Sequence, residues 1–290
     1  ALDGATDVDL ATGAITLNTS AANGAVALTG GAVDGAQNLT ITAGSGAVSL
    51  GAIGAGAAIG TLDIDTTGTT TVNGNIVAGS IALDGATDVD LATGAITLNT
   101  SAANGAVALT GGAVDGAQNL TITAGSGAVS FDGVGQNTAI GALDVDTTGA
   151  LTFNDALAAG SIALDGAANV DLATGAVTLN TSAANGVVTF ATAGAIDGGQ
   201  NLTITAGSGA VNLSAIGAGT AIGALDIDTT GTTTVNGNIV AGSIALDGAT
   251  DVDLATGAIT LNTSAANGAV ALTGGAVDGA QNLTITAGSG

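Results

Sequence analysis

The sequence predicts an all-β fold, a three-sided parallel β-solenoid (β-helix) built from 81-residue repeats of about four turns each. Three observations support this prediction. The sequence repeats itself letter for letter with a period of 81 residues. Within each repeat, short segments of β-forming residues are separated by Gly, Asn, Asp and Ser. The chain has 3 Phe and no Trp or Tyr, so it can fill only a thin interior, layer by layer. An antiparallel sandwich or barrel would also give short strands, but it does not account for the long identical repeats.

The repeat divides the chain into four copies, which span residues 1–81, 82–162, 163–244 and 245–290. Residues 82–130 are identical to residues 1–49, and the fourth copy is truncated. The third copy carries one inserted residue between Val187 and Ala195. We expect a single continuous solenoid segment over residues 1–290, as part of a longer parent protein.

Each expected strand is a short segment in which apolar and polar residues alternate, and no segment has the 3.6-residue period of a helix. Turns are supplied by pairs such as Asn23-Gly24 and Asp34-Gly35, because Gly adopts positive φ and Asn or Asp bonds to its own backbone. Along the first copy and into the second, the expected strands are Val8–Leu10, Ile15–Leu17, Val26–Leu28, Leu39–Ile41, Val48–Leu50, Leu62–Ile64, Thr70–Val72 and Ile81–Leu83.

These strands group into four expected turns of the solenoid per repeat, Asn38–Gly60, Thr61–Gly79, Ser80–Gly94 and Ala95–Gln118. This grouping stacks Leu39, Leu62 and Ile81 in one inner column, with successive turns about 4.8 Å apart.

The three Phe support the assignment of the inner face. They replace aliphatic residues that are expected to point inward: Phe131 stands where the first copy has Leu50, Phe153 where it has Val72, and Phe190 where it has Leu28. A slip of one residue would turn all three to the opposite face.

Asp side chains are the main candidates for a site. In Asp7-Val8-Asp9 and Asp63-Ile64-Asp65, the apolar residue is expected inside and both carboxylates outside. The expected stacking places Thr42, Asp65, Asp84 and Asn99 in one outer column, with Asp65 and Asp84 about 5 Å apart.

Two carboxylates this close either share a proton or bind a cation such as Ca²⁺. The candidate metal ligands are therefore Asp65 with Asp84, Asp146 with Asp165, and Asp228 with Asp247. We favour solvated acids that maintain solubility over weak cation sites, and both over a glycosidase-type carboxylate pair.

The charge composition excludes several functions. The chain carries 23 acidic residues, all Asp, and no Lys, Arg, His or Cys, which gives a formal charge of −23. It lacks the usual general bases, nucleophiles and phosphate clamps, so we expect no enzyme. Nucleic acid and anionic membranes would repel it, and no run of apolar residues is long enough to insert into a membrane. We expect no required cofactor, with Ca²⁺ as the optional ligand.

Three long phrases of the repeat resemble the β-strand repeats of very large bacterial surface proteins, the filamentous-haemagglutinin-like and autotransporter-type adhesins. These phrases are GAQNLTITAGSGAVSLGAIGAG, LDIDTTGTTTVNGNI and SIALDGATDVDLATGAITLNT, and the likeness covers essentially the whole chain. The resemblance implies a right-handed parallel β-helix, secretion to the cell surface or beyond, and a stalk that presents binding regions located elsewhere. It supplies no catalytic residues.

The leading functional hypothesis is a non-catalytic structural shaft of an extracellular bacterial adhesin or cell-surface filament. Its partners would be copies of itself or neighbouring repeats, and a host or neighbouring-cell surface reached through other regions. The alternative is a self-assembling extracellular fibre, sheath or matrix protein whose solenoids associate laterally or end to end. A polysaccharide-acting β-helix enzyme is the minor alternative.

Overall fold

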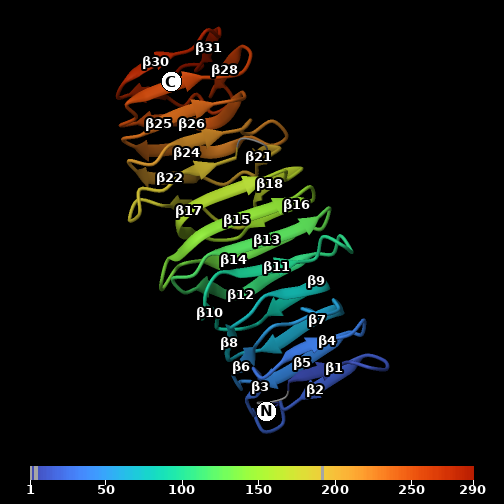
Figure 1. Cartoon of the computed structure of the whole chain (residues 1–290). Helices are drawn as coiled ribbons and strands as arrows, with labels where there is room; N and C mark the ends of the chain where they lie inside the picture. Colours follow the sequence, from blue (N-terminus) through green and yellow to red (C-terminus); the bar gives the residue numbers. More distant parts are fainter. Residues whose placement is uncertain (1, 3–5, 191–192) are drawn as a thin grey trace. The chain divides into compact units, whose positions relative to one another are not determined.

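The computed structural model describes residues 2, 6–190 and 193–290, and the regular structure within these residues consists of strands. The chain forms two compact units, residues 1–149 and 150–290. Each unit is a parallel β-solenoid, which confirms the predicted fold class. Figure 1 shows the strands of each unit stacked in successive turns. Among the described residues, no helix could cross a bilayer. The handedness of the coil and the single continuous segment stay predictions.

The strands are short, as the alternating segments predict. In the first unit they are β1 (Asp7–Asp9), β2 (Ile15–Asn18), β3 (Val26–Leu28), β4 (Ala32–Asp34), β5 (Leu39–Gly44), β6 (Val48–Leu50), β7 (Ile59–Thr66), β8 (Thr69–Val72), β9 (Ile76–Asp84), β10 (Asp88–Leu91), β11 (Ile96–Asn99), β12 (Val107–Asp115), β13 (Leu120–Gly125), β14 (Val129–Val134) and β15 (Ile140–Thr147).

The strands of the second unit have similar lengths. They are β16 (Ala150–Phe153), β17 (Leu157–Asp165), β18 (Asn169–Leu172), β19 (Val177–Asn180), β20 (Val188–Thr189), β21 (Ala195–Asp197), β22 (Leu202–Gly207), β23 (Val211–Leu213), β24 (Ile222–Thr229), β25 (Thr232–Val235), β26 (Ile239–Asp247), β27 (Asp251–Leu254), β28 (Ile259–Asn262), β29 (Val270–Thr273), β30 (Ala276–Asp278) and β31 (Leu283–Thr286). The insertion predicted between Val187 and Ala195 falls in a stretch that includes residues 191–192, which lie outside the described residues.

Three parallel ladders form the sides of the first unit, and they are named A, B and C in the order in which the stretch from Ile15 to Val33 visits them. Ladder A runs through Ile15, Leu39, Leu62, Ile81, Val107 and Val129. Ladder B runs through Val26, Val48, Thr70, Val89, Val114 and Val134. Ladder C runs through Val8, Val33, Ile53, Ile76, Leu98, Ile122 and Val145.

The second unit has three ladders of the same kind. One joins Leu151, Val170, Ile196, Ile216, Ile239, Leu261 and Ile285. Another joins Ile162, Val188, Val211, Thr233, Val252 and Val277. The last joins Leu157, Leu179, Ile204, Ile227, Leu246 and Leu272.

The interior of each unit is a thin stack of aliphatic side chains. Leu39, Leu62 and Ile81 stack in register and are at most 1% exposed, as predicted. The three Phe are also at most 1% exposed, so their predicted inward orientation is confirmed. Burying one such side chain contributes roughly 1.5 to 3 kcal/mol, whereas ordering the backbone costs about 1 to 2 kcal/mol per residue. Stability therefore depends on stacking against neighbouring turns.

Asn residues at the corners join each turn to the next. Asn104 has a positive φ of 56°, a conformation that Asn tolerates better than most residues. Its side-chain Oδ1 accepts a hydrogen bond of 2.9 Å from the backbone N–H of Ser126, which lies on the following turn. Asn23 makes the same bond with Ser45 in the first copy. The Asn-Gly pair, which predicts a tight turn of the backbone, thus also links successive turns of the solenoid.

The predicted division into four turns per repeat is wrong after Ile81. The expected turn Ser80–Gly94 would place Ile96 directly above Ile81 on ladder A. Instead Ile81 pairs with Val107, and Thr110 lies 26 residues after its partner Asp84. Ile96 pairs with Leu120 and belongs to ladder C. The sequence pattern misleads here because all three sides carry the same alternation, so it does not say which side a strand occupies.

As a result, each 81-residue repeat falls short of four complete turns of the solenoid by one side. Val8 lies on ladder C, whereas its copy Val89 lies on ladder B. Leu39 lies on ladder A, and its copy Leu120 follows Ile96 on ladder C. Identical sequence segments therefore occupy different sides of the same solenoid.

Candidate functional site

Stacked acids form the predicted outer column on ladder A. Asp65 pairs in register with Asp84, and Thr42 precedes Asp65 in the same column. The next member is Thr110, whose hydroxyl donates a hydrogen bond of 2.6 Å to Oδ1 of Asp84. Asn99 was predicted here, but it pairs with Val77 and Thr123 on ladder C. This error has the same cause as the misplaced turn, because Asn99 follows Ile96.

The second unit contains one equivalent pair. Asp228 pairs in register with Asp247, and the hydroxyl of Thr273 donates to Oδ1 of Asp247. The remaining predicted pair is divided between the units, with Asp146 in the first and Asp165 in the second. The predicted adjacency is thus confirmed for two pairs, and their binding of a cation stays a prediction.

The electrostatic effect of the pair is visible at a third acid. Asp63 is half-buried, and burial together with the nearby charges of Asp84 and Asp65 raises the pKa of Asp63. The predicted exposure of both acids in Asp63-Ile64-Asp65 therefore holds for Asp65 and only in part for Asp63. Within the described residues, no group of three or more acids is arranged to hold a metal ion.

Calcium titration tests the predicted cation pairs. If they bind Ca²⁺, millimolar Ca²⁺ at constant ionic strength should raise the melting temperature, because a ligand bound only to the folded state stabilises it. The rise should shrink in Asp65→Asn and again in Asp65→Asn/Asp228→Asn. An unchanged melting temperature at millimolar Ca²⁺ would reject the cation hypothesis.

A second acid pair was not predicted, and it is more deeply placed. The side chains of Asp88 on β10 and Asp115 are in contact, although Asp88 pairs in register with Ala113 and Asp90 pairs with Asp115. Asp115 is only 2% exposed. The Oδ1 atom of Asp88 is buried and has no hydrogen-bond donor. The sequence pattern predicts that the equivalent Asp7 and Asp9 face solvent. That holds for the first copy, where both are exposed, but not for Asp88.

Hydrogen bonds distinguish the two acids of this pair. Burial opposes ionisation of Asp115, but the N–H groups of Thr138 and Asn137 and the contact with Asp88 outweigh it and lower the pKa of Asp115. The two N–H groups donate to Oδ1 of Asp115, each at 2.9 Å. Burial first, and then Asp115 and Asp90, raise the pKa of Asp88 to about 6.

The third copy contains an amide in place of the first acid. Asn169 occupies the position of Asp88, and Asp197 occupies that of Asp115. In the amide orientation that the hydrogen-bond network requires, Nδ2 of Asn169 donates to Oδ2 of Asp197 at 2.9 Å and to the carbonyl oxygen of Ala195 at 2.7 Å. The signal in the sequence is therefore the Asp-to-Asn difference at this position between otherwise similar copies.

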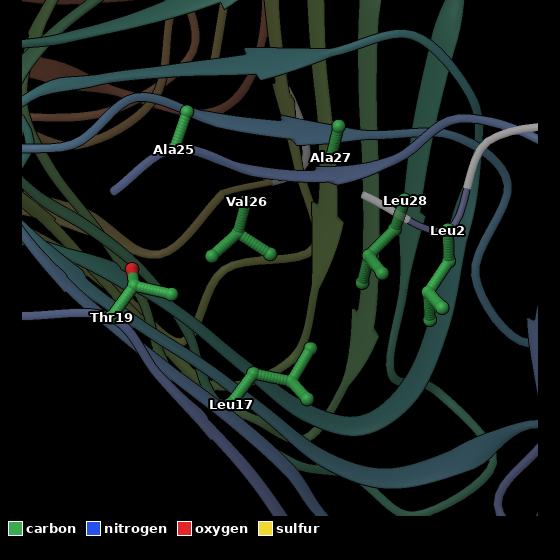
Figure 2. A pocket seen from close by; sticks show the side chains of 7 residues that line it. All are labelled: Leu2, Leu17, Thr19, Ala25, Val26, Ala27 and Leu28. Carbon is green, nitrogen blue, oxygen red and sulfur yellow. The ribbon is translucent and has the colours of Figure 1, made fainter.

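The N-terminal hollow, lined by Leu2, Leu17, Thr19 and residues 25–28, has a volume of about 220 Å³. Figure 2 shows Leu2, Leu17, Val26 and Leu28 pointing into one space. Five of the seven equivalent residues in the second copy are at most 2% exposed, because preceding turns of the chain stack on that part of the repeat: Leu83, Leu98, Thr100, Val107 and Leu109. The hollow is thus an uncovered layer of solenoid interior and does not have the polar groups of a ligand pocket.

Comparison with known proteins adds no relative to this picture: no family model, curated protein or solved structure matches the chain.

Proposed function

We propose that the chain is a segment of the structural shaft of an extracellular bacterial adhesin or cell-surface filament, without a catalytic role. The observation that carries this proposal is the solenoid itself. In each unit, three parallel ladders repeat with an aliphatic interior. A solenoid of this kind can be lengthened by adding repeats without a new core. Length is the property that a shaft requires.

The outer surface supports the same proposal. Its stacked side chains are mainly Thr, Asp and Asn, as in the Thr42, Asp65, Asp84 and Thr110 column. No cationic side chain is present in the sequence to neutralise the acids. Self-repulsion of these acids keeps neighbouring molecules apart at low salt. This favours a separate shaft over the self-assembling fibre.

Removal of one repeat from the intact gene tests the proposal. Excision of residues 82–162 joins Ile81 to Ala163, which restores the normal repeat sequence at the junction. We expect cells to keep a surface filament, detected by immunogold electron microscopy, that is shorter by one repeat. A variant carrying a Gly/Ser-rich segment of equal length in place of residues 82–162 is the control for chain length without solenoid structure.

Three outcomes would overturn the proposal. Antigen found only inside the cell would exclude a surface shaft. Ordered bundles formed by the purified protein at low salt would favour the self-assembling fibre. Turnover of any member of a polysaccharide panel would favour the β-helix enzyme.

A further inference from the structure

Two acids meet at the contact between the turns that carry β10 and β12, with no cation to neutralise them. Asp88 and Asp115 are the pair, and Asp90 is the other titratable group beside them, on β10 itself. The opposite neighbour of β10 is β8, which presents Thr69, Thr70 and Thr71 to the strand. The following turn contributes the neutral residues Asn137 and Thr138.

The bonds made by Asp115 favour its ionised form. Its Oδ1 accepts two backbone N–H groups, and its Oδ2 accepts the side-chain Nδ2 of Asn137 at 3.0 Å. Asp34 holds the equivalent loop of the first copy through the N–H groups of Gly56 and Ala57. Asp197 does the same in the third copy with Gly219 and Thr220. The second acid of each pair is therefore a fixed acceptor.

The first acid of the pair faces this acceptor and needs a donor. Oδ1 of Asp88 is buried and receives no hydrogen bond, and the same is true of Oδ1 of Asp251 in the fourth copy. An ionised carboxylate has no proton to donate, whereas a protonated one donates through its O–H. One proton on Asp88 would supply the hydrogen bond to Asp115. It would also remove the repulsion between the two carboxylates.

The third copy shows how the contact is built when a permanent donor is present. Asn169 donates both amide protons, one to Asp197 and the other to the backbone of Ala195. Asn has nearly the shape of a protonated Asp. The chain itself therefore contains the substitution that mimics the protonated acid, at the equivalent position.

We propose that the contact between these turns is a proton-linked joint, in which Asp88 holds a proton in mild acid, donates it to Asp115, and loses it as the solution approaches neutrality. Asn169 with Asp197 is its pH-independent form. The joint does not depend on the proposed shaft function.

The direction of the pH effect follows from the two acids. Folded Asp88 keeps its proton up to a pKa of about 6, compared with an ordinary value of 3.8, so the stability that the proton confers falls as the pH rises from about 4 to about 6. The lowered pKa of Asp115 acts in the opposite sense, because its contribution is lost as the pH falls below about 3.8. From these two acids we therefore expect maximum stability close to about pH 4.

Exchange of the two natural residues tests the joint. At pH 8, Asp88→Asn should raise the folding equilibrium constant by about tenfold, which corresponds to an increase of about 2 °C or more in melting temperature. Asn169→Asp should lower both by a similar amount. At pH 4.5 the effect of Asp88→Asn should be much smaller than at pH 8, because folded Asp88 then keeps its proton. Asp226→Asn is the matched control, because it removes one charge from an exposed position whose partners are Thr203 and Ala245.

Proton release distinguishes the joint from a packing effect. Calorimetric unfolding at pH 5 in two buffers of different ionisation enthalpy should show about one proton fewer released by Asp88→Asn than by the wild type. Equal proton release, or equal effects of Asp88→Asn at pH 8 and pH 4.5, would overturn the proposal. So would a Ca²⁺-dependent rise in stability at pH 8 that Asp88→Asn abolishes, because the pair would then bind a metal ion.

Discussion

Gly105→Ala should destabilise the protein strongly, whereas Gly199→Ala should not. Each of the four copies has Gly at the position of Gly105, whereas the position of Gly199 is occupied by Ala36 and Ala117 in the first two copies. A Cβ at Gly105 would overlap the carbonyl oxygen of Gly79 and lie 2.7 Å from its carbonyl carbon, both on the preceding turn. Backbone must move to relieve this contact, and we expect a loss of at least about 2 kcal/mol.

Gly199→Ala is the control in this comparison. A Cβ at Gly199 would have no atom within 4 Å. Because Ala restricts the unfolded chain more than Gly, this variant should be unchanged or up to about 1 kcal/mol more stable. Urea unfolding followed by circular dichroism measures both. Equal losses in the two variants would show that the contact with Gly79 is not what requires Gly at position 105.

Phe131→Ala should cost about 3 to 5 kcal/mol of unfolding free energy, the usual range for truncating a buried Phe. Phe131 is fully buried, and it stacks on Leu109 in the column that ladder A places inside the solenoid. The interior is only one side chain deep in each turn, so little neighbouring material can move to fill the cavity. Thermal and urea unfolding should both report the loss.

Phe131→Leu separates the loss of volume from the loss of the aromatic ring. The first copy has Leu50 at this position, and Leu50 is also fully buried. The variant should therefore lose less than about 1.5 kcal/mol, as for hydrophobic replacements of similar size. A loss equal to that of Phe131→Ala would mean that a specific contact of the ring, and not its bulk, stabilises the second copy.

The sequence was sufficient to predict which side chains form the interior of the solenoid. Alternation gives the inner face of each strand, and the substitution of Phe131 for Leu50 confirms it independently, because a large aromatic residue tolerates only that side. The pairing of Asp65 with Asp84 followed from the same reasoning, since both are placed by the inner residues Ile64 and Leu83.

The side on which each strand lies could not be predicted in the same way. Nothing in the alternation distinguishes Ile96 from Val107 as the residue that stacks on Ile81. The turn from Thr100 to Gly105 separates the strands that carry these two residues, and in it the hydroxyl of Thr100 donates to the carbonyl oxygen of Gly105 at 2.6 Å. The pair of Asp88 and Asp115 was missed for the same reason, because these acids become neighbours only when β10 and β12 occupy one side.

The displacement of each repeat by one side determines how the copies present their surfaces. Along the first unit, a residue and its copy in the next repeat point in different directions around the solenoid, as Leu39 and Leu120 do on ladders A and C. A ligand-binding peptide grafted once per repeat would therefore be displayed around the circumference, and would not form a single stripe. Loss of one repeat by recombination would rotate every later site by one side as well as bring it closer. Adding or deleting copies in such an array thus changes the direction around the solenoid in which its epitopes point, together with their distance along the solenoid.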